Sequence, residues 1–109
     1  MAGPTMSRDS RRFLRLVDAQ RGELERIFRD YGATNPRIIG SVARGAATAE
    51  SDLDIVVDMD PADGNLLMRA AGLLEETRAL FERDDIDIFP SQLLRGRVSR
   101  TALSDAIPL

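Results

Sequence analysis

The feature that most constrains this 109-residue chain is a glycine–serine pair followed, after ten residues, by two aspartates in an Asp-x-Asp arrangement. Gly40 and Ser41 end a short apolar run, and Asp52 and Asp54 open a β-branched run that continues to Val57. Apolar runs of this length, bounded by turn residues, are typical of buried strands. The sequence therefore predicts two strands, with a tight turn after the first and paired carboxylates at the start of the second.

The two aspartates are expected to project from one face of the second strand. Residues two apart on a strand point the same way, so Asp52 and Asp54 share a surface. The alternate residues are apolar and are expected to point into the core: Leu53, Ile55 and Val57. Adjacent carboxylates repel each other unless a cation lies between them, and hard oxygen ligands suit Mg²⁺ shared with substrate phosphates. This half of the pattern predicts a magnesium site.

The glycine–serine pair supplies a complementary place for an anion. Gly40 lets the backbone approach a ligand closely, and Ser41 offers a hydroxyl and an N–H group. If the following residues form a short helix, its N-terminal amides point at the same anion. The glycine–serine turn therefore predicts a site for an anion.

The complete pattern, Gly40-Ser41 followed by ten residues and Asp52-x-Asp54, resembles the signature of the DNA polymerase β-type nucleotidyltransferase superfamily. The surrounding Gly-Ser-x-Ala-Arg-Gly and Ser-Asp-x-Asp are similar to its smallest branch, the minimal nucleotidyltransferases, often encoded beside HEPN-domain toxins as their antitoxins. The resemblance implies an α+β fold with a small mixed β-sheet packed by helices on one side. It also implies two Mg²⁺ ions as cofactors and ATP as the nucleotide donor.

The resemblance assigns metal-binding and catalytic roles to three aspartates. Asp52 and Asp54 would hold the metal ions, and a third carboxylate on a later strand, flanked by apolar residues, would ligate the metal that activates the attacking hydroxyl. Asp87 lies between two isoleucines and matches that position. Asp85 is the alternative, because a strand over residues 84–89 would place it on the same face; the flanking pattern favours Asp87.

The same resemblance assigns nucleotide-binding roles around the turn. Gly40 and Ser41 would cradle the β- and γ-phosphates. Arg44 matches the family's arginine after the turn and would pair with phosphate through its two-pronged guanidinium. The alternative for Arg44 is a surface arginine bonded to a nearby carboxylate, and the sequence does not favour either interpretation.

The length and the resemblance together suggest how an acceptor is presented. We expect a single minimal nucleotidyltransferase domain over residues 1–109, with residues 1–6 disordered. Larger nucleotidyltransferases carry a second domain that binds the acceptor, and this chain is too short to include one. We therefore expect another chain to present the acceptor. The resemblance implies an antitoxin that transfers AMP from ATP onto a hydroxyl of its cognate HEPN-type toxin within a hetero-oligomer. The alternatives are a non-catalytic antitoxin that occludes its toxin and a small-molecule, antibiotic-type nucleotidyltransferase.

Composition excludes several other kinds of chemistry. The chain contains no cysteine and no histidine, which removes disulfides, thiol nucleophiles, imidazole bases and the usual zinc sites. A formal net charge of −3 argues against direct nucleic-acid binding, which needs clustered positive charge. The first twelve residues lack the apolar core of a signal peptide, and no run approaches membrane-spanning length. We therefore expect a cytoplasmic protein without a membrane anchor.

Hydrophobic periodicity and turn residues predict the order of the elements. Helices are expected over residues 7–31, with a break possible at Gly22, and over residues 66–83. A last helix would begin after Ser91 and bear Leu94, Val98 and Ala102. The strands are expected over residues 37–41, 52–58 and 84–89, with a turn at 35–36, an exposed loop at 46–50 and a breaker-rich connection at 59–64. Residues 106–109 form a tail that docks or frays.

Overall fold

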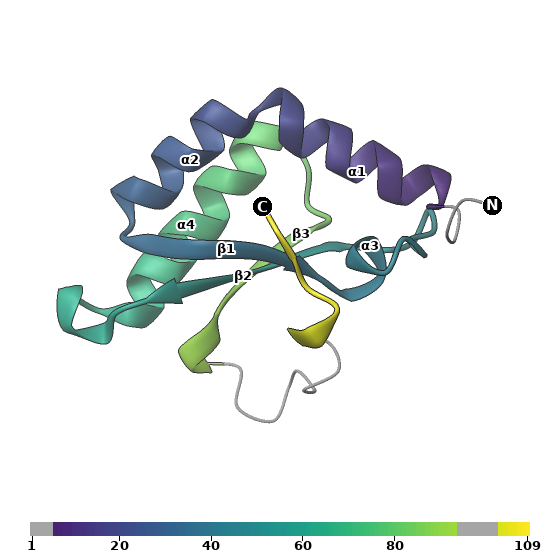
Figure 1. The fold of residues 1–109 in the computed structure, drawn as a ribbon. Helices are drawn as coiled ribbons and strands as arrows, with labels where there is room; N and C mark the ends of the chain where they lie inside the picture. The colour runs from purple at the N-terminus through teal and green to yellow at the C-terminus, as the bar shows by residue number, and fades with distance from the viewer. Residues whose placement is uncertain (1–5, 94–102) are drawn as a thin grey trace.

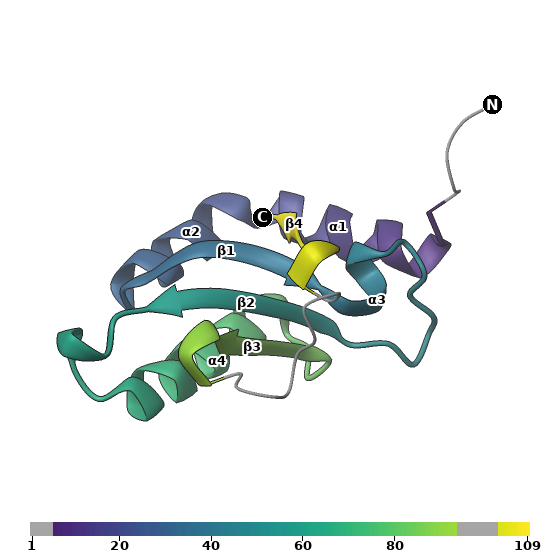
Figure 2. The ribbon, with the colours of Figure 1, turned by 60° about the horizontal axis from the view of Figure 1, so that its bottom comes forward.

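The computed structural model describes residues 6–93 and 103–109, and four strands of these residues form one mixed sheet (Figures 1 and 2). They are β1 (Ala33–Ile39), β2 (Leu53–Met59), β3 (Ile86–Pro90) and β4 (Ile107–Pro108). Their order across the sheet is β3-β2-β1-β4. β1 pairs antiparallel with β2 and β4, whereas β2 and β3 are parallel. The expected α+β class with a small mixed sheet is confirmed.

The helices cover one face of this sheet. The longer ones are α1 (Arg8–Ala19), α2 (Arg21–Asp30) and α4 (Leu66–Phe81), and Figures 1 and 2 show all three on the same side. The shorter ones are α3 (Gly40–Ala43) and the 3₁₀ turns η1 (Pro61–Asp63) and η2 (Ser91–Leu93). None of the helices in the described ranges combines the length and the apolar character that spanning a membrane requires.

The main core lies between these helices and the sheet. Apolar side chains of the three long helices meet alternate residues of the strands, and burying them supplies the principal driving force for folding. The strand residues in this cluster include Ile38, Leu53, Ile55, Val57, Ile86 and Ile88. Leu53, Ile55 and Val57 are fully buried, as the alternation in β2 predicted. The intervening residues of β2 therefore point to the opposite face.

The predicted helix over residues 7–31 is two helices, and the break lies at Gln20 rather than at Gly22. Figure 1 shows α1 and α2 meeting at an angle over the curved sheet. Ser7 caps α1 by accepting a hydrogen bond from the Ser10 N–H at 3.1 Å. Hydrophobic periodicity indicates that a segment is helical, but it does not report where the axis bends to follow a twisted sheet.

The predicted turn at residues 35–36 is wrong, because both residues belong to β1. The pairing register of β1 with β2 shifts between Thr34 and Arg37, and Asn35 adopts a positive φ of 50°. This is a bulge, which accommodates a proline that cannot donate to the ladder. The first strand is therefore longer than predicted at its start, and it ends at Ile39, before the Gly40-Ser41 turn.

Other boundaries differ by smaller amounts. β2 is shifted by one residue, α4 ends two residues early, and β3 begins at Ile86 rather than at Asp84. The C-terminal tail docks as β4, through backbone pairing of Arg37 and Ile38 with Pro108 and Ile107. The predicted last helix with Leu94, Val98 and Ala102 lies outside the described residues.

The start of α1 fastens the loop that leads to Asp52. The Ser7 hydroxyl donates to the Ala47 carbonyl oxygen at 2.8 Å, and the Ala47 N–H donates to the Ser10 hydroxyl at 2.9 Å. Ser10 is fully buried and Ala47 is 3% exposed. The loop at residues 46–50 is exposed as predicted except at Ala47, where it is anchored to the start of α1.

Candidate functional site

The register of the sheet brings Asp54 and Asp87 side by side. β2 and β3 run parallel, and Asp54 is paired directly with Asp87. Both side chains project from the face opposite the helices, because their neighbours along each strand are buried in the helix-side core. Asp52 directly precedes β2 and is exposed, whereas Asp54 is half-buried. Carboxylates from two separate segments of the chain therefore meet on the face of the sheet opposite the long helices.

Electrostatics reflects this convergence at Asp54. Burial raises the pKa of the Asp54 carboxyl to about 6, and the neighbouring carboxylates of Asp87 and Asp52 add to the increase. A group shifted in this way is costly to ionise in the metal-free protein. A bound cation would relieve the cost, so the local electrostatics favour binding of a cation.

The Gly40-Ser41 turn lies against this carboxylate. Ile39 is paired with Asp54 across the antiparallel ladder, so Gly40 directly follows a partner of the aspartate. Gly40 has a φ of +75°, and a Cβ atom placed there would lie 3.1 Å from Asp54 Oδ2. Glycine is thus required both by the backbone conformation and by the close approach of Asp54. The structure places the predicted phosphate cradle beside the predicted metal ligands.

The short helix expected after the turn is present as α3. Ile39 is its N-cap residue and provides no side-chain hydrogen bond, and the Ser41 side chain is half-buried. Val42 is fully buried and belongs to the core. Arg44 is exposed at the end of α3, and within residues 6–93 and 103–109 its guanidinium makes no ion pair. Phosphate binding by Arg44 stays a prediction.

Asp85 does not share a face with Asp87, so that part of the sequence prediction is wrong. Asp85 precedes β3, and Arg83 holds both of its carboxylate oxygens at 2.7 and 2.6 Å. The Arg83 hydrogen bonds lower the pKa of Asp85, and the Arg83 guanidinium lies 5.2 Å from the centre of the Phe13 ring on α1. The Asp85 carboxylate is thus paired with Arg83 on the helix side of the sheet.

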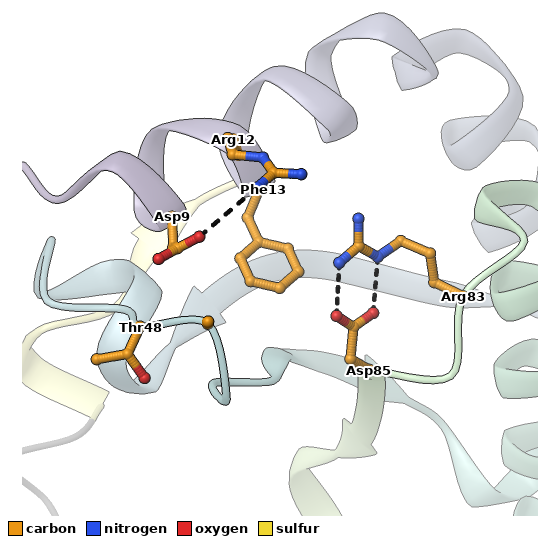
Figure 3. A pocket seen from close by; sticks show the side chains of 7 residues that line it. Asp9, Arg12, Phe13, Thr48, Arg83 and Asp85 are labelled. Atoms are coloured by element: carbon orange, nitrogen blue, oxygen red, sulfur yellow. Dashed lines mark hydrogen bonds and ion pairs between the residues drawn. The ribbon is translucent and has the colours of Figure 1, made fainter.

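Figure 3 shows the small pocket in which Asp85 lies. Its volume is about 100 Å³, and it is formed between α1, the loop before Asp52 and the start of β3. Its lining residues are Asp9, Arg12, Phe13, Thr48, Ala49, Arg83 and Asp85. Opposite charges pair within it, Asp9 with Arg12 and Asp85 with Arg83. This pocket is separate from the face that carries Asp54 and Asp87.

Sequence reasoning missed one residue at the site, Arg78 of α4. Its Nη2 atom donates to Asp87 Oδ1 at 2.9 Å, and its Nε atom donates to the Ile86 carbonyl oxygen at 2.8 Å. No local pattern signals this contact, because the arginine lies in a helix and its partners lie in the next strand. Only the packing of α4 against β3 brings them together.

The carboxylates fit a magnesium ion by their chemistry, although they are not arranged as a ready-made cage. Within the described parts of the chain, no three acidic side chains are positioned together to hold a metal ion. Asp87 is turned to Arg78, and Asp52 is exposed ahead of the strand. The donors are nevertheless hard oxygens, and their repulsion at Asp54 is the kind that a divalent cation neutralises. Asp52, Asp54 and Asp87 are the residues that would hold it.

An apolar groove runs along β3. It has a volume of about 420 Å³ and lies between α4 on one side and β3 with η2 on the other. Its lining residues are Leu67, Ala70, Ala71, Leu74, Ile88, Phe89, Pro90 and Leu93. Leu67 is 68% exposed, and its neighbour Met68 is 72% exposed. Ile88 in this lining belongs to the helix-side core, whereas Asp87 before it projects from the opposite face of β3.

Comparisons with known proteins agree with this geometry. The family described as Nucleotidyltransferase domain matches residues 20–109. A solved structure described as "Structure of putative minimal nucleotidyltransferase" is 33% identical in sequence, with a TM-score of 0.72. The alignment covers 88% of this chain and 95% of that one. A search of curated proteins found no match.

Proposed function

Because the chain belongs to the nucleotidyltransferase domain family, we propose that it transfers AMP from ATP onto a hydroxyl of a partner protein. The family supports nucleotidyl transfer in general terms; the nucleotide, the protein acceptor and an antitoxin role are the proposed parts. The observation that carries the proposal is the pairing of Asp54 with Asp87 across β2 and β3, with the Gly40 turn against Asp54.

The reaction needs positioning and charge neutralisation more than a reactive side chain. Bound Mg²⁺ would neutralise the triphosphate and favour ionisation of the attacking hydroxyl. The carboxylates of Asp52, Asp54 and Asp87 would hold the metal, and Gly40 and Ser41 would receive the phosphates on backbone and hydroxyl groups. The acceptor oxygen forms a bond to the α-phosphorus, and the bond from that phosphorus to the bridging oxygen breaks. Pyrophosphate leaves with the electron pair, and the hydroxyl proton passes toward Asp87.

The apolar groove supports a protein acceptor. Exposed leucine and methionine side chains beside an apolar groove are typical of protein-binding surfaces. Leu67 of α4 lines this groove, and its neighbour Met68 is also largely exposed. The partner class that the sequence resemblance implies is a HEPN-type toxin, so the proposed physiological role is that of an antitoxin that silences its toxin by nucleotidylation.

The test is the intact mass of the protein encoded next to this chain, after co-expression with wild type, Asp52→Asn or Asp58→Asn. We expect a mass increase of one or more AMP groups with wild type and with Asp58→Asn, and none with Asp52→Asn. Asp58→Asn is the matched control, because Asp58 shares β2 with Asp54 but is bonded to protein groups.

Other outcomes identify the alternatives. A stable complex without any adduct, formed equally by wild type and Asp52→Asn, would contradict catalysis and establish neutralisation by occlusion. Nucleotidylation of a small hydroxyl compound by the purified chain alone, without modification of the co-expressed protein, would instead establish a small-molecule enzyme.

A further inference from the structure

Arg78 connects the helix layer with the opposite face of the sheet, the face from which Asp54 and Asp87 project. It belongs to α4, which packs beneath the sheet, and β3 lies at one end of the described strand order. The Asp85 carbonyl oxygen accepts from the Leu53 N–H, so the next carbonyl along the strand, that of Ile86, points outward from the sheet. Arg78 donates to that outward carbonyl and continues to Asp87. The side chain therefore passes around the edge of the sheet.

We propose that Arg78 is a positioning residue for the third carboxylate, holding Oδ1 of Asp87 and leaving Oδ2 for the metal ion. The inference rests on the proposed function, since it concerns the same site. Of the two carboxylate oxygens of Asp87, only Oδ1 accepts a hydrogen bond from a side chain of the described residues. An arginine anchored to backbone at Nε has little freedom left, so the carboxylate that it holds is restricted to few orientations.

The neighbouring Arg83–Asp85 pair shows the contrasting arrangement, in which one arginine takes both oxygens of an aspartate. Arg83 takes both oxygens of Asp85, through Nε at 2.7 Å and Nη2 at 2.6 Å. Arg78 divides the same two donor positions between a backbone carbonyl and one carboxylate oxygen. The two pairs have similar exposure, 35% and 33% for Arg78 and Asp87 against 38% and 32% for Arg83 and Asp85. Only the first leaves a carboxylate oxygen for a ligand.

A fixed carboxylate matters most where its charge must be shared with a metal. Partners that orient a metal ligand from behind restrict its rotation and raise its affinity for the ion. Without Arg78, the Asp87 side chain would rotate away from Asp54, whose negative charge repels it. Part of the free energy of metal binding would then be used to bring the two carboxylates together, so the affinity for the metal would fall.

The experiment measures binding of Mn²⁺ to the full chain, by the electron paramagnetic resonance signal of the free ion, without nucleotide or acceptor. The variants are Arg78→Met, Arg78→Lys, Asp54→Asn and the matched control Arg83→Met. We expect Arg78→Met to weaken Mn²⁺ binding about 10-fold, and Arg83→Met to stay within about twofold of wild type. Arg78→Lys retains the charge but cannot bridge both acceptors, so its affinity falls between those of Arg78→Met and wild type.

The outcomes separate this inference from the proposed function. If wild type and Asp54→Asn fail equally to bind Mn²⁺, the proposed function falls and the inference with it. If wild type binds and Asp54→Asn does not, but Arg78→Met equals wild type or Arg83→Met, the positioning role alone is overturned. Tighter binding by Arg78→Met also overturns it, because the arginine would then compete with the metal. Should Arg78→Met not fold, wild-type affinity in Arg78→Lys would overturn the positioning role in the same way.

Discussion

Asp54 and Asp58 lie on the same strand and the same face of the sheet, yet their surroundings are opposite. Asp54 is half-buried beside other carboxylates, and its pKa is raised to about 6. Burial would also raise the pKa of Asp58, but hydrogen bonds from Ser91, Asn35 and Arg37 outweigh it and lower that pKa. The Ser91 hydroxyl donates to Asp58 at 2.8 Å and Arg37 at 3.1 Å.

The difference shows that one strand provides both a candidate functional residue, Asp54, and a structural residue, Asp58. Asp58 joins the bulge of β1 to β2 and to η2, so its negative charge is used within the fold. No basic group among the described residues compensates the charge of Asp54. The neighbouring carboxylates of Asp87 and Asp52 make its ionised form still less favourable. Carboxylates that destabilise a fold in this way are characteristic of functional sites, because a ligand repays the cost.

The largest expected effect separates the two aspartates by activity. Asp54→Asn removes the charge of a proposed metal ligand and should lower the rate of nucleotidyl transfer about 1,000-fold, whereas Asp58→Asn should keep it within about threefold of wild type. The measurement is the initial rate of labelling of the co-expressed partner with radioactive ATP and saturating Mg²⁺. Equal losses in the two variants would show that position on the strand face, not the local environment, decides function.

Gly40 tests how closely the turn must approach Asp54. Gly40→Ala places a Cβ atom 3.1 Å from Asp54 Oδ2 at a φ of +75°. We expect transfer to slow about 100-fold, because the carboxylate must shift, and the protein to lose about 1 kcal/mol of unfolding free energy. The measurements are the labelling rate and urea unfolding.

The control for this substitution is Gly22→Ala in α2. A Cβ atom at Gly22 meets nothing within 4 Å, and its φ is not positive. Alanine there should stabilise the protein by up to about 1 kcal/mol and leave activity unchanged. Loss of activity in Gly22→Ala would mean that the effect at Gly40 is a general response to alanine rather than a consequence of Asp54.

Stability should change in opposite directions at the two aspartates. In metal-free protein at pH 7.5, Asp54→Asn removes a charge that is costly to hold and should raise the unfolding free energy by about 1 kcal/mol, after allowance for solvent screening. Asp58→Asn loses charge-assisted hydrogen bonds and should lower it by about 1 kcal/mol. Urea unfolding in EDTA measures both. A lower unfolding free energy in Asp54→Asn than in wild type would contradict the claim that the charge of Asp54 is uncompensated.

The smallest effect is the pH dependence of these differences. The pKa of Asp54 is raised from 3.8 to about 6, so its contribution to stability is present below pH 3.8 and is lost as the pH rises through about 6. The advantage of Asp54→Asn should therefore appear between these values and vanish at acidic pH. Asp58 behaves inversely: its contribution is present above 3.8 and is lost as the pH falls through its lowered pKa. Urea unfolding of each variant against wild type from pH 3.5 to 8 measures this.

The sequence predicted the face of each strand better than the partners of each side chain. Alternation in β2 placed Leu53, Ile55 and Val57 in the core, because a strand has a period of two whatever packs against it. The same alternation failed for Asp85, because the strand begins only at Ile86 and Arg83 turns the carboxylate to the helix side. Element ends depend on contacts that no local pattern contains.

Two further contacts at the site were beyond sequence reasoning for the same reason. Arg78 reaches Asp87 across the gap between a helix and a strand, and Ser7 and Ser10 fasten a loop almost forty residues away. Ser7 is a residue type that commonly caps a helix, and it caps α1, but its second contact depends on the loop that lies beside it.

The sequence by itself determined the α+β class, the family signature in Gly40-Ser41 and Asp52-x-Asp54, and the faces that are buried. These follow from periodicity and from residue types that local backbone geometry demands. The tertiary structure decided which carboxylates meet, which are compensated, and that Arg78 holds Asp87. Such pairings depend on the register of parallel strands and on helix packing, and these are set by the whole core rather than by neighbouring residues.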